Sequence, residues 1–353
     1  MTALAPCSVY ASPRWLAVQT AGGRAPSRLL TAPDAAGAPR AWLPVHDRLP
    51  TRNPRYRLAW LCRGFPEAPE AASYVGLASG YQTEIATVAE PGDPGGAELL
   101  AALLGEALRD GPRQPLVVPY ATDRLARALA RIAPDALCVL EAADAWLINP
   151  HPPFEAWLAA LPRETRRIVL QDQRRFAAAG FAEAVLPLAP HVGRFAELVS
   201  LHARRYGLDE PVAQLAPHLA DIAAAFGDDA VLFAALHGGE LVAAALGLVH
   251  GAHLYMRMVG NDHAVVGGTA AHFALAFYRP LGFCAQRGLA GVHLGLSIDR
   301  TKRALGAAIQ PLWTIVLGDL PARVDASALL PARLDALTRE DAGGAAQIRE
   351  QLR

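Results

Sequence analysis

One stretch of the sequence decides the fold: Ala230-Val-Leu-Phe-Ala-Ala-Leu-His237-Gly-Gly-Glu240-Leu-Val-Ala-Ala-Ala-Leu-Gly-Leu248. Its two apolar runs, Ala230 to Leu236 and Leu241 to Leu248, predict buried strands. Between them, the glycines of His237-Gly-Gly-Glu240 supply the positive φ angles that a tight hairpin turn requires. The stretch therefore predicts an antiparallel hairpin.

The residues that follow extend this hairpin into a larger α/β arrangement. A third strand is expected from Ala252 to Val259, and Gly267-Gly-Thr269 is expected to open a helix. The remaining expected elements are a helix over Thr269 to Gln286 that Gly288 ends, a buried strand over Val292 to Gly295, and a last strand over Ile309 to Val316. This order predicts an α/β (α+β) fold with a mixed, largely antiparallel sheet flanked by helices.

The rest of the chain indicates two such halves. Helices are expected over Ala97 to Arg109, Asp123 to Ile132, Glu164 to Ala179, Pro190 to Tyr206 and Val212 to Phe226, and strands over Pro115 to Pro119, Ala136 to Leu140 and Ala145 to Ile148. The start of the chain, with the apolar runs Trp15 to Val18 and Ala41 to Val45, favours strands and turns. Asn149-Pro-His-Pro-Pro153 is the clearest linker. We therefore expect domains at 1–150 and 151–320, and a helical tail at 321–353 with Asp325 and Thr338 as caps.

Composition excludes several classes of protein. The 33 basic and 33 acidic residues give a net charge of zero, so the chain has no global basic field. Four scattered cysteines, without a CxxC pair or metal-ligand spacing, predict reduced thiols and no metal site. No signal peptide and no apolar run of about 18 residues is found, so we expect a cytoplasmic protein without a membrane span. The sequence also lacks a GxSxG elbow and a P-loop lysine.

Lys302 is the only lysine in the chain, and the other 32 basic residues are arginines. An ammonium is a compact point charge on a flexible stem, whereas a guanidinium is a planar fork. A chain with this bias that keeps one lysine is expected to use its geometry, and the alternative is a surface lysine that survived by chance. The lysine lies shortly after the expected buried strand, within Leu294-Gly295 through Thr301-Lys302-Arg-Ala-Leu-Gly306.

Three segments between about Phe154 and Trp313 carry a family resemblance. They are the basic segment that begins with Phe154 to Arg163, the helix Leu201-His-Ala-Arg-Arg-Tyr206, and the run from Leu294 through Lys302 to Pro311-Leu-Trp313. Together they resemble the FemABX-like, tandem-GNAT acyltransferases of the GNAT superfamily. The resemblance implies two GNAT-like domains, of which the one at 1–150 is degenerate. It also implies a bacterial enzyme that forms an amide bond between an activated acyl group and an amine.

The resemblance assigns the charge-stabilising role to Lys302. In the family this lysine stabilises the charge that develops when an amine attacks an activated acyl carbon. A preorganised cation at an oxyanion contributes several kcal/mol to such a step. The family often has Phe before the lysine, whereas this chain has Thr301.

The resemblance allows two acyl donors. Aminoacyl-tRNA is the leading candidate, and acyl-CoA is the alternative. Family relatives that use coenzyme A have a polar residue at the start of the glycine loop, where this chain has Val265. Expected donor-binding residues are Gly267, Gly268, Thr269, Arg303, Arg166, Arg167 and Arg174, and Arg175, Arg204 and Arg205 add to the basic arc. Such an arc can neutralise RNA phosphates, and the alternative is a solvated helix face balanced by Glu164 and Asp172. Neither co-substrate is a resident cofactor.

Other residues complete the expected site. Tyr255 and Arg257 should share one face of a strand with His253, a candidate base, and the alternative is that all three are ordinary core or edge residues. Tyr81, Glu84 and Tyr206 are expected to contact the acceptor, a small-molecule amine or a cell-wall precursor. From another class of protein, the rival hypothesis is a catalytically inactive GNAT-like binding module.

Overall fold

The computed structural model describes residues 8–33, 39–48, 53–87, 93–110, 114–148, 153–296 and 300–352. These residues form two compact units. Unit 1 contains Met1–Asp144, Leu296–Asp299 and Ile309–Arg353, and unit 2 contains Ala145–Gly295 and Arg300–Ala308. The expected linker at 149–153 lies, except for Pro153, outside the described residues, so the domain bounds stay a prediction. Among the described residues, no helix has the length and apolarity needed to cross a membrane.

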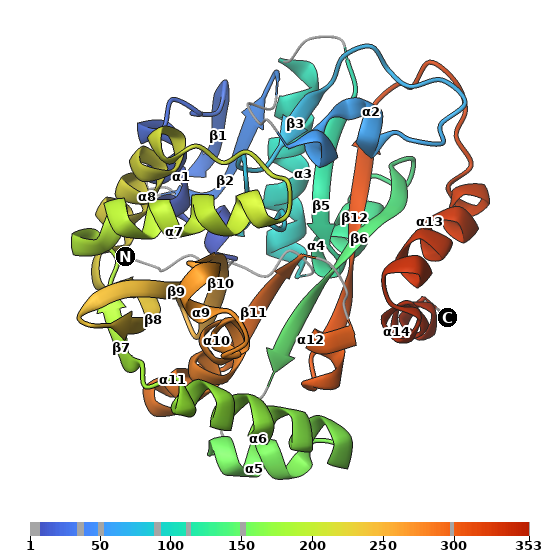
Figure 1. Ribbon diagram of the computed structural model, residues 1–353. Helices are drawn as coiled ribbons and strands as arrows, with labels where there is room; N and C mark the ends of the chain where they lie inside the picture. Colours follow the sequence, from blue (N-terminus) through green and yellow to red (C-terminus); the bar gives the residue numbers. More distant parts are fainter. Residues whose placement is uncertain are drawn as a thin grey trace. The chain divides into compact units, whose positions relative to one another are not determined.

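Unit 2 is built on the predicted meander (Figure 1). Its strands are β7 Ala182–Pro187, β8 Ala230–His237, β9 Glu240–His250, β10 His253–Asn261 and β11 Gly291–Leu296, of which the last residue belongs to unit 1. Strands β7 to β10 pair antiparallel in sequence order, and β11 pairs parallel to β10. The predicted hairpin turn is confirmed, since Gly238 has φ 59° and Gly239 has φ 86°. Strand β7 was not expected; it is short, mostly exposed and pairs with β8.

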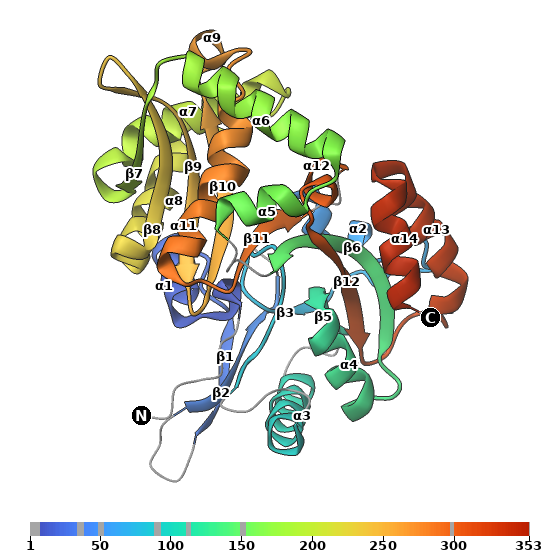
Figure 2. The ribbon, with the colours of Figure 1, turned by 90° about the horizontal axis from the view of Figure 1, so that it is seen from below.

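Helices cover both faces of these strands, as Figure 2 shows, with α7 and α8 on one side and the helical segment 271–287 on the other. The helices of unit 2 are α5 Phe154–Ala160, α6 Arg163–Ala178, α7 Val192–Arg205, α8 Val212–Phe226, α9 His263–Val266, α10 Ala271–Phe273, α11 Arg279–Arg287 and α12 Arg300–Ala304. A π-helical turn, Ala274–Tyr278, joins α10 to α11. The long helix expected from Thr269 thus begins at Ala271. Its π-helical turn, which is wider than an α-helical turn, comes just before Pro280, a residue without an N–H to donate.

A glycine allows α7 to lie close to β10. A Cβ on Gly260 would come within 2.8 Å of both the Leu198 Cβ and the Val199 backbone nitrogen. Any larger residue would push helix and strand apart. Because α7 lies this close, the side chain of His202, one turn after Leu198, reaches the end of β10.

Unit 1 combines segments from both ends of the chain. Its strands are β1 Arg28–Pro33, β2 Pro39–His46, β3 Ser73–Val75, β4 Ala86–Thr87, β5 Leu116–Thr122, the first part of β6 Leu137–Ile148, and β12 Ala308–Leu317. Its helices are α1 Pro13–Ala21, α2 Leu58–Leu61, α3 Pro94–Arg109, α4 Asp123–Ile132, α13 Ala326–Glu340 and α14 Ala342–Gln351. Strand β12 pairs antiparallel with β5, which pairs parallel with β3.

A buried carboxylate ties the two ends of the chain together in unit 1. Glu141 Oε1 accepts hydrogen bonds from Trp60 Nε1 at 2.9 Å and Arg63 Nη1 at 2.6 Å. Its Oε2 accepts from Thr314 Oγ1 at 3.2 Å and Arg333 Nη1 at 3.1 Å. Burial raises the pKa of Glu141, and the two guanidiniums oppose that rise. The four bonds hold α2, β12 and α13 in one arrangement.

Three expectations were wrong in detail. The run Trp15 to Val18 lies in a helix, α1, because Ser12 caps it and Pro13 occupies its first position. Strands expected at 136–140 and 145–148 are one long strand, β6. Thr338 is not a cap; its hydroxyl donates to the Leu334 carbonyl inside α13. Asp341 caps α14 instead, whereas Asp325 caps α13 as predicted.

Candidate functional site

Strands β10 and β11 part in the middle of unit 2. Their parallel ladder has three residue pairs and ends at Tyr255 and His293, although β10 continues to Asn261. Where they part, Arg257 forms a β-bulge: Met256 pairs with Gly247 and Met258 with Leu246, so Arg257 faces no residue on β9. A bulge redirects side chains and is common beside functional sites. The bulge interrupts the regular alternation between Tyr255 and Arg257, and Arg257 is buried. A role of these two residues in the site stays a prediction.

Four rings gather at the paired end of these strands. The Trp146 ring centroid, from the end of β6, lies 5.4 Å from that of His253, 5.6 Å from Tyr255 and 4.7 Å from His293. His253 and Tyr255 share one face of β10, as predicted, with 6.4 Å between their centroids. Burial, followed by the neighbouring His293, lowers the pKa of His253. A neutral imidazole of this kind can accept a proton.

A second group, the histidine cluster, lies at the far end of β10 and consists of His202, Asn261, His263 and His272. The nitrogens His202 Nδ1 and His263 Nε2 are 3.0 Å apart, and Asn261 Nδ2 is 3.2 Å from His202 Nδ1. The His202 and His272 rings are nearly parallel, at 5.8 Å between centroids. Burial, then the charges of His272, His263 and Arg205, lowers the pKa of His202 to about 4.

The glycine turn follows the histidine cluster along the chain. Gly267 and Gly268 are exposed, and Gly268 has φ 78°. Thr269 Oγ1 donates to the Val266 carbonyl at 2.7 Å and accepts from the Ala271 N–H at 3.3 Å. The turn therefore leads into a helix N-terminus, where backbone N–H groups favour anions. Its role toward a donor stays a prediction.

Lys302 is fixed by the backbone around it. It lies in α12 and is 7% exposed. The Ala307 N–H donates to the Lys302 carbonyl at 3.1 Å and the Gly306 N–H to the Arg303 carbonyl at 2.9 Å, which is the Schellman arrangement. Gly306 has φ 90°, a value that favours glycine. The glycine after the lysine therefore ends the helix in a fixed geometry, and Lys302 is not an exposed surface residue.

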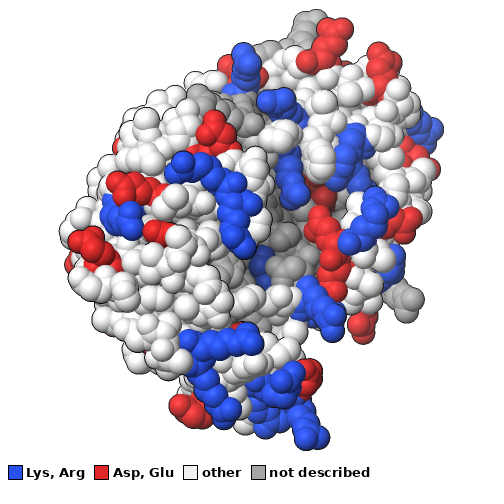
Figure 3. Space-filling view, in the orientation of Figure 1, with Lys and Arg blue, Asp and Glu red and all other residues white. Residues whose placement is uncertain are grey.

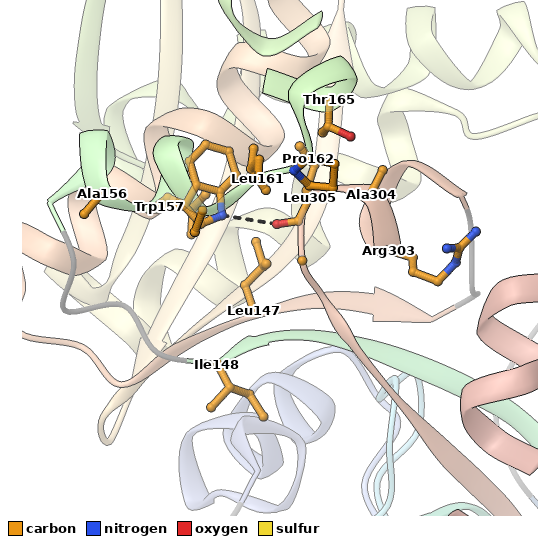
Figure 4. Close-up of a pocket in the computed structure, with 13 residues that line it drawn as sticks. Leu147, Ile148, Ala156, Trp157, Leu161, Pro162, Thr165, Arg303, Ala304 and Leu305 are labelled. Carbon is orange, nitrogen blue, oxygen red and sulfur yellow. Dashed lines mark hydrogen bonds between the residues drawn. The ribbon is translucent and has the colours of Figure 1, made fainter. Parts of the chain in front are cut away.

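A cavity of about 560 Å³ lies against α12, α5, α6 and the end of β6 (Figure 4). We refer to it as the α5–α12 cavity. Its described lining is aliphatic apart from the Trp157 indole and two polar side chains, Thr165 and Arg303. Trp157 Nε1 donates to the Leu305 carbonyl at 3.1 Å, which fixes the indole against the turn after Lys302. Arg303 extends from α12 on the side away from Trp157 (Figure 4).

Helix α6 carries the strongest local charge in unit 2, and basic side chains gather over it in Figure 3. It has five arginines, Arg163, Arg166, Arg167, Arg174 and Arg175, against two acids. Arg167 pairs with Glu164 at 2.6 Å on an exposed face. Asp172 is buried and accepts from Tyr278 Oη at 2.9 Å, so it anchors α6 rather than balancing its surface. Tyr206, at the end of α7, is 63% exposed and its ring contacts His202.

The two remaining expected residues belong to unit 1. Tyr81 is half-buried against the ring of Tyr10, at 5.5 Å between centroids. Glu84 is buried, pairs with Arg124 and accepts from Thr122 Oγ1. These bonds give Glu84 a structural function within unit 1, and acceptor contact by either residue stays a prediction.

The histidine cluster and the α5–α12 cavity were not predicted from the sequence. His202 lies 61 residues before His263 and meets it, and the nearby His272, because α7 packs on β10. Three histidines near a glycine turn gave no metal spacing in the sequence, and the described residues contain no group of three or more ligands that could hold a metal ion. Trp157 lies within the segment Phe154 to Arg163, yet nothing in the sequence places its indole against Leu305.

Comparison with known proteins decides the family. The FemAB-like model, described as peptidoglycan biosynthesis/recognition, matches residues 89–306, more than half of the chain and including Lys302. The chain belongs to the FemAB-like family. This family is described as peptidoglycan-related, and the predicted FemABX-like membership is confirmed. No curated protein sequence matches the chain.

Solved structures confirm the fold of this FemAB-like protein. FemX is 10% identical with a TM-score of 0.57, over 89% of this chain and 93% of FemX. L-PGS from Bacillus licheniformis is also 10% identical, with a TM-score of 0.55 over 93% of this chain and 97% of that one. At this identity the similarity shows the fold alone. The expected α/β architecture with a largely antiparallel sheet flanked by helices is confirmed.

Proposed function

We propose that this FemAB-like protein is an N-acyltransferase that joins an activated aminoacyl group to an amine, with aminoacyl-tRNA as the donor. The observation that carries the proposal is Lys302. The only ammonium side chain of the chain is buried, is held by a fixed helix end, and lies inside the segment that the family model matches.

The chemistry requires a cation where negative charge develops. The acceptor nitrogen attacks the ester carbonyl carbon, and the carbonyl oxygen becomes an oxyanion. When this intermediate collapses, the C–N bond remains, the C–O bond to the ribose breaks, and the amine proton passes to the released hydroxyl group. A preorganised cation stabilises the oxyanion most strongly away from bulk water, which suits the buried position of Lys302.

Two further groups fit defined parts in this reaction. His253 has a lowered pKa and is therefore neutral near pH 7, as a base that accepts the amine proton must be. Arg166, Arg174 and Arg175 lie on α6 and form no salt bridge within the described part of the chain, so they are available to phosphates of the donor.

Acyl-CoA is the second candidate donor, and one feature favours it. Strands β10 and β11 part after Tyr255 and His293, and the glycine turn at Gly268 opens a helix N-terminus beyond the end of β10. An extended thioester between two strands, with its phosphates at a helix N-terminus, would use both features. Val265 argues against acyl-CoA as the donor, because coenzyme A loops have a polar residue at this position.

A donor screen tests the proposal. The purified protein is incubated with total bacterial tRNA charged with labelled amino acids, or with an acyl-CoA mixture, and a small-molecule amine extract. We expect amide products and loss of the aminoacyl ester, both reduced in Lys302→Ala. Thiol release from acyl-CoA without ester loss would select the second donor. No turnover of either donor above Lys302→Ala would contradict catalysis and favour a binding module.

A further inference from the structure

The α5–α12 cavity is chemically unlike the rest of the candidate site. Its volume of about 560 Å³ falls within the roughly 300–1,000 Å³ of small-molecule pockets. Leu147, Leu161, Leu281 and Leu305 supply most of its wall, together with Ile148, which is 60% exposed. A wall of this apolar kind is typical of small-molecule pockets.

The wall offers very few hydrogen bonds to a ligand. The Trp157 N–H is already donated to the Leu305 carbonyl, so the indole presents only carbon surface to the cavity. Apart from the Arg303 guanidinium, Thr165 is the only polar side chain of the described lining, and it contributes one hydroxyl group. A nucleobase or a sugar would lose several hydrogen bonds to water here without replacement, at a cost of about 1–3 kcal/mol for each group left unsatisfied. An aliphatic chain would lose none.

Positive charge lies at the edge of this apolar wall. Arg303 lines the cavity, and Thr165 stands on α6 between Arg163 and Arg166. Arg163 and Arg166 form no ion pair within the described ranges of the chain. The nearest acid, Glu164, is exposed and pairs with Arg167. The cavity therefore combines an aliphatic interior with one cationic side chain, the guanidinium of Arg303.

We infer that the α5–α12 cavity binds the aliphatic chain of an anionic, single-chain amphiphile, with its carboxylate or phosphate group at Arg303. Arg303 directly follows Lys302, so the chain would belong to one substrate of the transferase: the acyl group or the amine acceptor. This role rests on the proposed function, whereas the binding itself does not.

Titration with fatty carboxylates below their micelle concentrations tests the inference, with calorimetry and Trp157 fluorescence as readouts. Affinity should rise roughly tenfold for every two methylene groups from octanoate to dodecanoate, because each adds apolar area to be buried. Dodecanoate should bind more tightly than dodecyltrimethylammonium, and Arg303→Gln should reduce that preference. Equal affinities for octanoate and dodecanoate would overturn the inference.

Matched variants on α5 locate the binding site. Ala156 and Ala160 line the cavity, whereas Ala159 is exposed on the same helix and does not. Ala156→Leu and Ala160→Leu should weaken dodecanoate binding by about tenfold or more, since they fill the volume that the chain needs. Ala159→Leu should change it less than about twofold. Equal losses in all three would place the ligand elsewhere.

Other occupants give different results. Displacement of dodecanoate by adenosine monophosphate would contradict the inference in favour of a nucleotide. Binding to phosphatidylglycerol vesicles without binding of monomeric dodecanoate would contradict it in favour of a membrane surface. A failure of the titration would leave the donor screen and the Lys302 variants unaffected, so this inference and the proposed function can fail separately.

Discussion

At the scale of single residues, Gly260 and His202 show how a close approach creates a chemical environment. The missing Cβ of Gly260 lets Leu198 and Val199 lie against β10. His202 is thereby brought to Asn261 and His263, away from water and next to other imidazoles. Burial disfavours the charged form of an imidazole, and a neighbouring cation disfavours it further. The result is a histidine whose pKa is lowered from 6.5 to about 4.

This histidine predicts acid sensitivity. Between pH 6.5 and 4 the folded chain binds fewer protons at His202 than the unfolded chain does. The contribution of His202 to the free energy of unfolding is therefore fully present above pH 6.5 and is lost as the pH falls from 6.5 to 4. In urea unfolding across this range, His202→Gln should show a shallower loss of unfolding free energy than wild type. His237→Gln, at an exposed position on β8, is the control and should keep the wild-type slope. Identical slopes for His202→Gln and wild type would refute the prediction.

At the scale of elements, α12 depends on the glycine that ends it. The φ of 90° at Gly306 disfavours a residue with a Cβ by about 1–2 kcal/mol, and the strain falls on the turn that holds Lys302. Gly306→Ala should lower kcat and speed hydrogen exchange of the amides at 302–307. Gly227→Ala, which introduces similar strain at φ 54° after α8, should lower stability but not kcat. Equal kcat in the two variants would show that this turn does not position Lys302.

Helix α6 gives the second prediction at this scale. If its arginines contact tRNA phosphates, changing Arg166, Arg167, Arg174 and Arg175 to Gln removes up to four contacts. The slope of log K against log salt should then flatten by about 0.7 for each lost contact to single-stranded RNA, so the loss of affinity is largest at low salt. The control changes four exposed arginines elsewhere, Arg109, Arg131, Arg287 and Arg323. The same change of slope in both variants would show that net charge, and not contact by α6, causes the salt dependence.

At the scale of the whole molecule, Arg333 on α13 attaches the C-terminal helices to the rest of unit 1. This buried guanidinium donates to Glu141 and to the carbonyls of Leu61 and Arg63. Arg333→Met leaves a buried carboxyl with one cation fewer, and should cost about 3–5 kcal/mol of unfolding free energy. The half-buried Arg349, which pairs with Asp335 at 3.9 Å and donates to Thr338 Oγ1 at 2.9 Å, is the control: Arg349→Met should cost less than about 1 kcal/mol. Comparable losses in urea unfolding would mean that Glu141 does not join the ends of the chain.

The sequence predicted local structure better than long-range pairing. The meander and its turn, α4 and α8 were predicted closely, because apolar periodicity and glycine turns are local signals. Helix α1 was missed although Ser12 and Pro13 are a helix start, since four apolar residues alone suggested a strand. The pairing of β12 with β5 joins segments that lie far apart along the chain, and no local pattern encodes it.

The same distinction applies to the candidate site. Lys302 could be found from composition and its neighbours. The bulge at Arg257, the histidine cluster and the α5–α12 cavity depend on which surfaces meet. A β-bulge in particular leaves no trace in the alternation of Tyr255 and Arg257, because it changes the register without changing the residues.

The central claim is that the ammonium of Lys302 stabilises the oxyanion of acyl transfer. With the donor that the screen identifies, the decisive measurement is kcat at saturating donor for Lys302→Ala, Lys302→Arg and the swap Lys302→Arg/Arg303→Lys, which keeps the composition unchanged. Melting temperature and donor binding of each variant serve as controls for folding.

We expect Lys302→Ala to lower kcat by about 10²–10³-fold with little change in donor binding. Lys302→Arg should restore only part of that loss, because the guanidinium fork cannot occupy the position of the ammonium, and the swap should remain as slow as Lys302→Arg. A Lys302→Arg variant with the kcat of wild type would contradict the account, since the chain's single lysine would then be an accident of composition.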